Sequence, residues 1–303
     1  MSPYKPSPSN VLGILGLSFA RTGKAFPVLF VLAVLVGGVG HWLMWQAGVL
    51  ALPHADPTNP QSQLIYSELT KLFVGAIWFT ITFPIIDAVT IYAWRRFATG
   101  QDFSAKKALN WAVGRYGRMF GPHAKAFLTI TAGMVIIVPG ILFGLQYAFV
   151  DAITATDDKS RSPLKRSAKL TRGRRGRILR AWLPYAIWYL PAFLVFVYQA
   201  EAGITLGDFE ISPHICVVVF GTFDVLVLAV MEMAMFGLYE ERVADAQRAK
   251  AAREARDADI GTNVGTNVET DTGAETETEL VDAASPDADT EVEDAEEGQL
   301  VQK

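Results

Sequence analysis

The chain has 303 residues, of which 51% are hydrophobic and only 19% are charged. A soluble protein of this size needs more charge on its surface, so the composition argues against a water-soluble globular protein. The segment from Asp257 to Lys303 contains 15 acidic residues and one basic residue, whereas basic residues predominate in the rest of the chain. Cys216 is the only cysteine, which excludes a disulfide-stabilised secreted scaffold.

Five long apolar runs are each long enough to cross the hydrocarbon core of a bilayer, which is roughly 30 Å thick. They cover residues 25–55, 72–94, 126–150, 181–200 and 211–239. The first run is predicted to be an uncleaved membrane helix, because its apolar core is longer than that of a typical signal peptide. The small residues around Val49-Leu50-Ala51 leave cleavage as the alternative.

Lys and Arg are unevenly distributed among the predicted loops. The stretches 95–125 and 151–180 are rich in both, whereas 47–70 and 201–213 contain neither. The positive-inside rule therefore places the two basic stretches, and the N-terminal stretch with them, in the cytoplasm.

Both flanks of the third run are basic, although one straight crossing would put them on opposite sides of the membrane. Pro139-Gly140 lies in the middle of this run. Proline removes a backbone donor and glycine permits unusual dihedral angles. We therefore predict a hairpin, with one helix up to about Val138, a turn at Pro139-Gly140 and a second helix that returns. A single crossing helix with a proline kink is the alternative.

The predicted fold is an all-α polytopic membrane bundle of about six segments, including this broken hairpin, with both termini in the cytoplasm. We expect residues 1–24 to form a cytoplasmic N-terminal segment with an amphipathic helix. Residues 25–256 are expected to form the membrane domain with a cytoplasmic helical extension. Residues 257–303 are predicted to be a disordered acidic cytoplasmic tail, because they cannot bury enough apolar area to order themselves.

Two amphipathic segments are predicted at the cytoplasmic headgroup level. The first is 103–120, in which Leu109, Ala112 and Tyr116 lie near one face. The second begins at Ser162 as N-cap, followed by Pro163 in the first turn. In this second helix, one face is formed by Leu164, Ser167, Ala168 and Thr171, while Lys165, Arg166, Lys169 and Arg172 take other positions.

Two motifs resemble a known group of bacterial membrane proteins. They are the Pro-Gly-Ile turn within residues 136–155 and the Lys/Arg-Ser-x-x-Leu-Thr-x-Gly pattern within residues 162–179. Together they resemble the membrane domain of some glycerophosphoryl diester phosphodiesterases and related uncharacterised six-helix families. The resemblance implies a polytopic inner-membrane protein whose basic segment is cytoplasmic. Phosphodiesterase activity belongs to a separate soluble domain in that family, so the motif residues are expected to be structural: Pro139, Gly140, Ser167, Leu170, Thr171 and Gly173.

No pattern typical of an enzyme or a cofactor site is present in the sequence. The four histidines are scattered and lack the spacing of a zinc helix, and the single cysteine adds no ligand pair. Neither a phosphate-binding loop nor a nucleophile elbow occurs. We therefore expect no enzymatic activity, no metal and no cofactor.

Three acidic residues, Asp87, Asp224 and Glu232, fall within the apolar runs. A carboxylate at mid-membrane costs roughly 2.5–3.5 kcal/mol on insertion scales, so these side chains should face the interior of the bundle. They are candidates for an intramembrane polar site. One interpretation is a packing contact with Gln146, Tyr147 or Thr80, and the other is a path for protons or cations.

The basic residues of the second amphipathic segment suggest binding of lipid headgroups, which are anionic in the cytoplasmic leaflet. The candidates are Lys165, Arg166, Lys169, Arg172, Arg174 and Arg175. Topology anchoring without a bound partner is the alternative, and nucleic-acid binding is not expected because no base-stacking module accompanies the charge. The acidic tail could bind a basic protein partner.

These features together predict a non-enzymatic membrane protein that organises the membrane or binds lipids or partners through its basic cytoplasmic face. A transporter or channel for a small solute, ion or lipid is the alternative function.

Overall fold

The computed structural model describes residues 10–52, 58–157, 161–199, 204–206 and 209–266, with side chains up to residue 189 and again from 211 to 256. The chain divides into two units, Met1–Lys250 and Ala251–Lys303. The described part of the second unit is the end of one long helix. The fold discussed below is that of the first unit.

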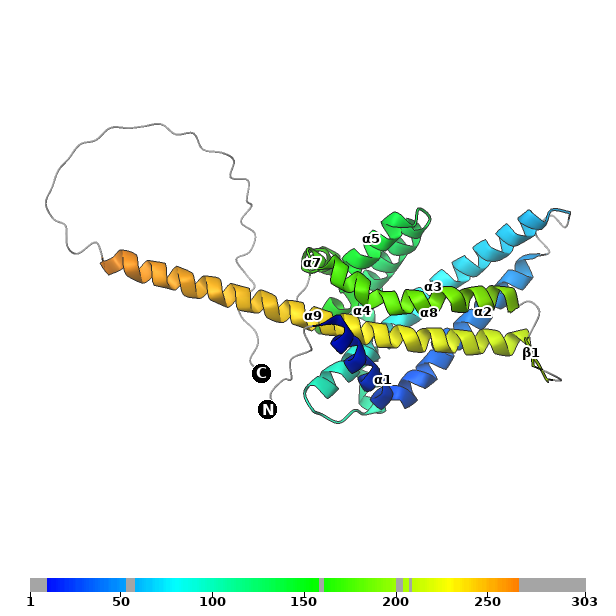
Figure 1. Ribbon diagram of the computed structural model, residues 1–303, viewed down its shortest axis with the longest axis horizontal. Coiled ribbons are helices and arrows are strands. Elements are labelled where there is room, and N and C mark those ends of the chain that lie inside the picture. The colour runs from blue at the N-terminus through cyan, green and yellow to red at the C-terminus, as the bar shows by residue number, and fades with distance from the viewer. Residues whose placement is uncertain (1–9, 53–57, 158–160, 200–203, 207–208, 267–303) are drawn as a thin grey trace, which may run out of the picture. The chain divides into compact units, whose positions relative to one another are not determined.

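Helices account for almost all of this unit (Figure 1). They are α1 (Val11–Ala33), the π-helix η1 (Val34–Gly38), α2 (Val39–Ala51), α3 (Pro60–Ala98), α4 (Ala105–Met134), α5 (Val138–Tyr147), α6 (Val150–Thr156), α7 (Pro163–Thr171), α8 (Arg175–Gln199) and α9 (Pro213–Thr266). Between α8 and α9, the short strands β1 (Ile204–Leu206) and β2 (Phe209–Ile211) pair antiparallel. The prediction of a helical fold is confirmed.

Four helical segments are long and apolar enough to cross a membrane: Val11–Ala51, Pro60–Ala98, Val138–Thr156 and Pro213–Arg256. Large apolar side chains cover their outer surfaces, among them Leu64, Phe73 and Ile77 on α3. A surface of this kind is unfavourable in water and favourable in lipid. The long apolar helices therefore fit a membrane-embedded protein.

Local sequence signals set several helix starts. The side chain of Asn10 caps α1 by accepting a hydrogen bond from the backbone N–H of Gly13. Asn59 caps α3 in the same way and is followed by Pro60 in the first turn. Ser162 and Pro163 open α7 as predicted, although the Ser162 side chain makes no capping hydrogen bond.

The first helical segment is continuous from Val11 to Ala51, because the π-turn of η1 joins α1 to α2. One helix therefore runs across residue 24, where the boundary between the N-terminal segment and the membrane domain is predicted. Gly37 and Gly38 in η1 allow α9 to approach closely, since a methyl group at Gly37 would overlap the backbone oxygen of Gly221. Trp78 donates a hydrogen bond to the carbonyl of Val36 at the same turn, at 2.8 Å.

The segment 103–120 is not a separate surface helix. It forms the first half of α4, which continues through Lys125 into the third apolar run and packs against α3. Its residues Ala108, Ala112 and Met119 are buried in the hydrophobic core. A helix with such a buried stripe is stabilised by packing rather than by the membrane surface.

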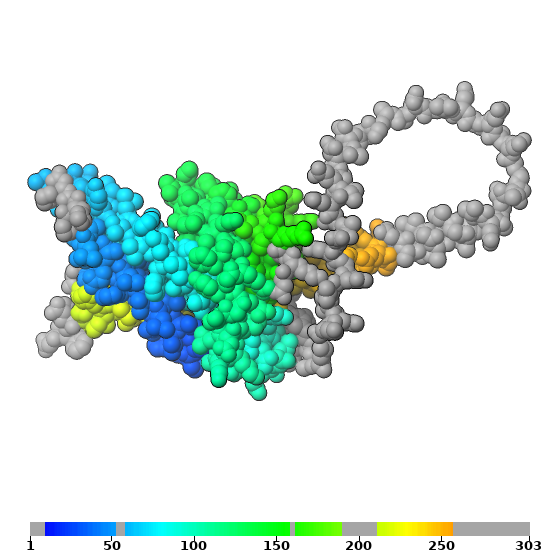
Figure 2. Space-filling view, turned by 180° about the vertical axis from the view of Figure 1, so that it is seen from behind, coloured from blue at the N-terminus to red at the C-terminus, as the bar shows by residue number. Residues whose placement is uncertain are grey.

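The chain turns at 135–137, earlier than predicted. α4 ends at Met134, α5 begins at Val138, and Ile137 between them adopts a φ of 56°. Pro139 therefore lies in the first turn of α5, where its missing N–H costs no helical hydrogen bond. The two helices contact each other, and Figure 2 shows them side by side with α3 on one face of the molecule.

The last helix also departs from expectation, because α9 continues to Thr266, past the predicted start of the disordered tail at Asp257. The Ala-, Arg- and Glu-rich sequence before this point favours propagation of the helix. The remainder of the predicted tail, 267–303, lies outside the described residues.

Candidate functional site

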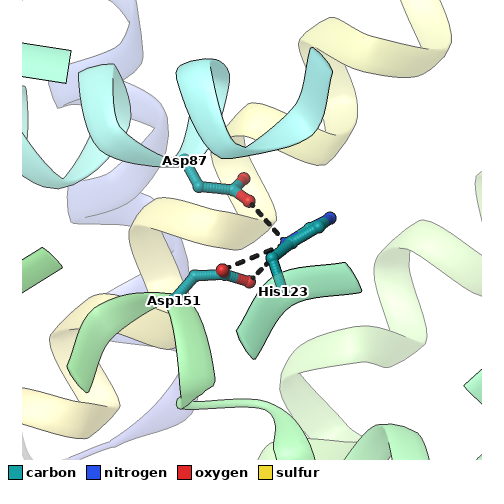
Figure 3. Close-up of side chains that lie close together, drawn as sticks. All are labelled: Asp87, His123 and Asp151. Carbon is teal, nitrogen blue, oxygen red and sulfur yellow. Dashed lines mark hydrogen bonds and ion pairs between the residues drawn. The ribbon is translucent and has the colours of Figure 1, made fainter. Parts of the chain in front are cut away.

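A buried cluster of one histidine and two carboxylates lies where α3, α4 and α6 meet. Asp87 comes from α3, His123 from α4 and Asp151 from the first turn of α6 (Figure 3). The antiparallel neighbours α3 and α4 contact each other extensively, and α6 packs against both. Residues that are far apart in the sequence are therefore held together by helix packing.

The histidine ring lies between the two carboxyl groups. Its Nδ1 atom is 3.0 Å from both carboxylate oxygens of Asp151 and 3.7 Å from Oδ2 of Asp87. Figure 3 shows this nitrogen facing both carboxylates while the other ring nitrogen points away. Phe127 stacks against the ring, with 6.0 Å between the ring centroids. A proton or a cation at Nδ1 would therefore be shared with carboxylate oxygens.

The second ring nitrogen of His123, Nε2, is buried and has no hydrogen-bond partner among the described residues. A buried polar atom without a partner costs about 1–3 kcal/mol. The polar contacts of the ring in this part of the chain all use Nδ1. The orientation of the ring is therefore set by the carboxylates and by stacking.

Glu232 adds a third carboxylate from α9. It is half-buried and interacts electrostatically with Asp87, Asp151 and His123. Three carboxylates that interact with a single imidazole carry an excess of negative charge. Buried negative charge of this kind is strongly unfavourable unless protons or a cation neutralise it.

Asp224, the third predicted acidic residue, lies in a different contact. Its Oδ1 atom accepts a hydrogen bond from the hydroxyl of Tyr185 at 3.0 Å, and its Oδ2 atom is 4.0 Å from Nε2 of His41. The structure therefore brings Asp87 and Glu232 together and separates Asp224 from both.

Gln146, Tyr147 and Thr80 are the packing partners predicted for these acidic residues. The backbone carbonyl of Gln146 accepts a hydrogen bond from Ser167, and the Thr80 hydroxyl is buried without a partner within the described segments. The side chain of Asp87 contacts His123, and that of Asp224 contacts Tyr185 and His41. A pocket lined by Leu170 of α7, Ile178 of α8, Leu238 of α9 and neighbouring residues includes neither Asp87 nor Asp224.

α7 is an amphipathic helix with a buried polar face. Ser167 and Thr171 are completely buried, whereas Lys165, Lys169 and Arg172 are exposed. The exposed residues follow the i, i+4, i+7 spacing of one helix face. We call Lys165, Lys169 and Arg172 the basic stripe.

The other predicted headgroup ligands are engaged within the protein or partly buried. Arg166 pairs with Asp157. Arg174 pairs with Glu241 at 3.2 Å and with Asp245 at 2.6 Å. Arg175 is half-buried, and its Nε atom has no hydrogen-bond partner in the described part of the chain. Of the six candidate residues, the three of the basic stripe are thus the exposed ones.

The predicted motif residues have structural roles around α7. The Ser167 hydroxyl bridges the carbonyl of Gln146 and the N–H of Phe149, which joins α7 to the end of α5. The carbonyl of Leu170 accepts a hydrogen bond from Arg242. Gly173 adopts a φ of 78° directly after α7, a conformation that favours glycine.

No protein-family model, no curated protein and no solved structure matches this chain. The resemblance to the phosphodiesterase membrane domain therefore stays a prediction.

Sequence reasoning missed His123 and Asp151. In the sequence, Asp151 directly follows the apolar run 126–150, and His123 has no histidine or carboxylate at zinc-helix spacing. Helical periodicity relates residues on the same helix, but these two residues meet through contacts between α4 and α6. One signal in the sequence points to their contact. His123 and Asp151 flank the predicted hairpin, and the two arms of a hairpin lie side by side, which brings the flanking residues together.

Proposed function

We propose that this chain is a non-enzymatic, multi-pass protein of a bacterial inner (plasma) membrane that binds anionic lipid headgroups through the basic stripe. The supporting observation is the division of α7 into two faces, with Ser167 and Thr171 buried and the three cationic side chains exposed. Because the buried face is hydrogen-bonded to α5, the cationic face is held in one orientation.

The membrane arrangement that we propose has six segments and places both termini in the cytoplasm. In it, α4 and α5 form a hairpin that enters the bilayer from the cytoplasmic side. The exposed apolar residues Val135, Ile136 and Val138 at the turn support this proposal, because they would be unfavourable in water. The hairpin keeps the basic stretches before and after it on the same side.

The expected strength of lipid binding follows from the number of free cations. A Lys or Arg near an anionic leaflet contributes about 1 kcal/mol, and salt weakens this attraction. Three such residues would therefore favour anionic over zwitterionic lipid by up to about a hundredfold. The fixed spacing of the stripe distinguishes this site from basic residues that only orient the protein.

Native mass spectrometry of the full-length protein tests the proposal. Protein in nonionic detergent is equilibrated with phosphatidylglycerol or phosphatidylcholine, and the bound lipids are counted. The wild type should prefer phosphatidylglycerol. In the triple variant K165Q/K169Q/R172Q, the ratio of phosphatidylglycerol binding to phosphatidylcholine binding should be at least tenfold lower.

A matched control removes the same charge elsewhere. The side chains of Lys106, Lys107 and Lys125 on α4 are also exposed. We expect the variant K106Q/K107Q/K125Q to retain most of the preference. Equal loss in both variants, or no preference in the wild type, would contradict specific binding by the basic stripe.

A transporter or channel for a small solute, ion or lipid is the second candidate function. The observation that favours it is the buried contact of Asp224 with Tyr185 and His41, which unites α9, α8 and α2 within the membrane segments. Proteoliposomes with an internal pH dye would detect proton flux. This function predicts that D224N slows the flux and that E68Q, at an exposed position on α3, leaves it unchanged.

The acidic tail is proposed to bind a basic protein partner. The segment 257–303 carries dense negative charge, which favours association with basic surfaces. Affinity purification with the full chain and with a chain that ends at residue 256 would compare the proteins retained. Identical sets of bound proteins would contradict a role for the tail.

A further inference from the structure

We propose that Asp87, His123 and Asp151 bind one divalent transition-metal ion of the Zn²⁺ or Mn²⁺ class. This inference is independent of lipid binding by the basic stripe, because the residues involved and their locations differ.

The donor atoms of Asp87, His123 and Asp151 lie close enough together to bind the same ion. One atom from each residue, the imidazole Nδ1 and two carboxylate oxygens, lies within 4.8 Å of the other two. Metal–ligand bonds of about 2.0–2.2 Å, typical of nitrogen and carboxylate ligands, place neighbouring ligands about 3 to 4 Å apart. The distances from Nδ1 to Asp151 and Asp87, 3.0 and 3.7 Å, lie in this range. An ion between the three donors thus requires little movement of the side chains.

The charge of the cluster favours a cation. Asp87, Asp151 and the nearby Glu232 are carboxylates, and His123 is the basic group that interacts with them in the described structure. With only one imidazole available, the excess negative charge requires additional protons or a metal ion. A divalent cation bound to a neutral imidazole would neutralise two of the carboxylates.

Access to the cluster is provided at Asp151. Its side chain is 22% exposed, whereas those of His123 and Asp87 are 7% and 6% exposed. An ion could bind first to the more exposed carboxylate and then reach the buried ligands. Partial burial would also exclude most water from the bound ion.

The ligand types limit the choice of metal. An imidazole nitrogen with carboxylate oxygens suits zinc, manganese or iron(II), whereas all-oxygen sites suit Mg²⁺ and Ca²⁺. Soft ions such as Cu⁺ prefer sulfur ligands. The cysteine of the chain, Cys216, is not part of the cluster.

The competing explanation is a simple ion pair in which Nδ1–H donates to Asp151. A metal would replace that proton at Nδ1. The same residues are in contact in the ion pair and in the metal-bound cluster, and only the amount of bound metal differs. A measurement of bound metal therefore distinguishes the two.

Full-length protein carrying an affinity tag without histidine is stripped with EDTA and dialysed against Mn²⁺ or Zn²⁺. Bound metal is measured by mass spectrometry of the elements, and Mn²⁺ also by electron paramagnetic resonance. The double variant D87N/H123N lacks two of the proposed ligands but keeps the acidic tail. Its bound metal therefore measures weak binding at the tail, and this amount is subtracted from the metal bound by the wild type. The wild type should bind one equivalent more than this variant, and D151N should bind at least tenfold more weakly.

D224N is the matched control, because it removes a buried carboxylate near a different histidine. It should bind metal like the wild type. The inference is overturned if the wild type binds no more metal than D87N/H123N, or if D224N loses as much binding as D151N. Should a variant not fold, the wild type alone decides: its apparent Tm should rise with Mn²⁺ concentration, and a constant Tm would contradict the site.

Discussion

The Ser167 hydroxyl on α7 donates a hydrogen bond to the backbone carbonyl of Gln146 at the end of α5, at 2.8 Å. The same oxygen accepts a hydrogen bond from the backbone N–H of Phe149, at 3.2 Å. α5 and α6 are separated by only two residues, so backbone groups at this junction cannot all be satisfied within a helix. A completely buried side chain from α7 satisfies two of them and thereby orients the basic stripe.

Replacing Ser167 with alanine should destabilise the protein by about 1–3 kcal/mol, because two buried backbone groups would lose their partner. The apparent Tm in detergent, measured at a fixed scan rate, should fall by several degrees. S162A is the control, since Ser162 is exposed and makes no capping hydrogen bond. Equal Tm values for S167A and the wild type would contradict the proposed role of the bridge.

The close approach of η1 and α9 predicts a strong effect at Gly37. A methyl group there would overlap the backbone of Gly221, so the variant G37A can fold only if the two helices separate. We expect a loss of about 1–3 kcal/mol, detected as a lower apparent Tm.

Gly16 on α1 provides the comparison, because a methyl group at that position would meet no atom within 4 Å other than the adjacent residues and backbone of its own helix. Alanine favours a helix over glycine by about 1 kcal/mol, so G16A should leave the Tm unchanged or raise it slightly. A G37A protein as stable as G16A would show that the helices do not approach as closely as described.

Trp94 joins α1, α3 and α9 and should be another sensitive position. Its ring is fully buried, its Nε1 atom donates to Glu240 at 2.7 Å, and the guanidinium of Arg21 lies 3.9 Å from its ring centroid. W94F should lose about 2 kcal/mol through the missing hydrogen bond and the smaller ring. Thermal unfolding monitored by circular dichroism would measure this loss.

Trp42 serves as the control for that substitution, because its side chain is partly exposed on α2. W42F should change stability by less than about 0.5 kcal/mol. Comparable losses in W42F and W94F would mean that the contacts of Trp94 do not stabilise the bundle.

The helical fold and its long apolar helices could be predicted from the sequence because apolar runs and helix caps are local signals. Ser162-Pro163 opens α7 as expected, and Ser167 and Thr171 form its buried face. The prediction of a turn at Pro139-Gly140 rests on the missing backbone donor of proline and the unusual dihedral angles open to glycine. In the structure, proline occupies the first turn of α5, where it is equally well tolerated.

The candidate metal site could be predicted only in part. A charged residue inside an apolar run is visible in the sequence, so Asp87, Asp224 and Glu232 were identified as buried polar candidates. Their partners depend on which helices pack together, and this information is not present in the periodicity of any one helix. His123 joins Asp87 because α4 continues into the bundle instead of ending at the membrane surface.

In the proposed topology, the α4–α5 hairpin keeps both basic stretches, 95–125 and 151–180, in the cytoplasm. Single cysteines at Gln61, Lys107 and Arg161, in a C216S background, test it in spheroplasts treated with a membrane-impermeant thiol reagent. We expect labelling at position 61, and protection at 107 and 161 until the cells are lysed. Labelling at 161 with protection at 107 would show a single crossing between them and would contradict the hairpin.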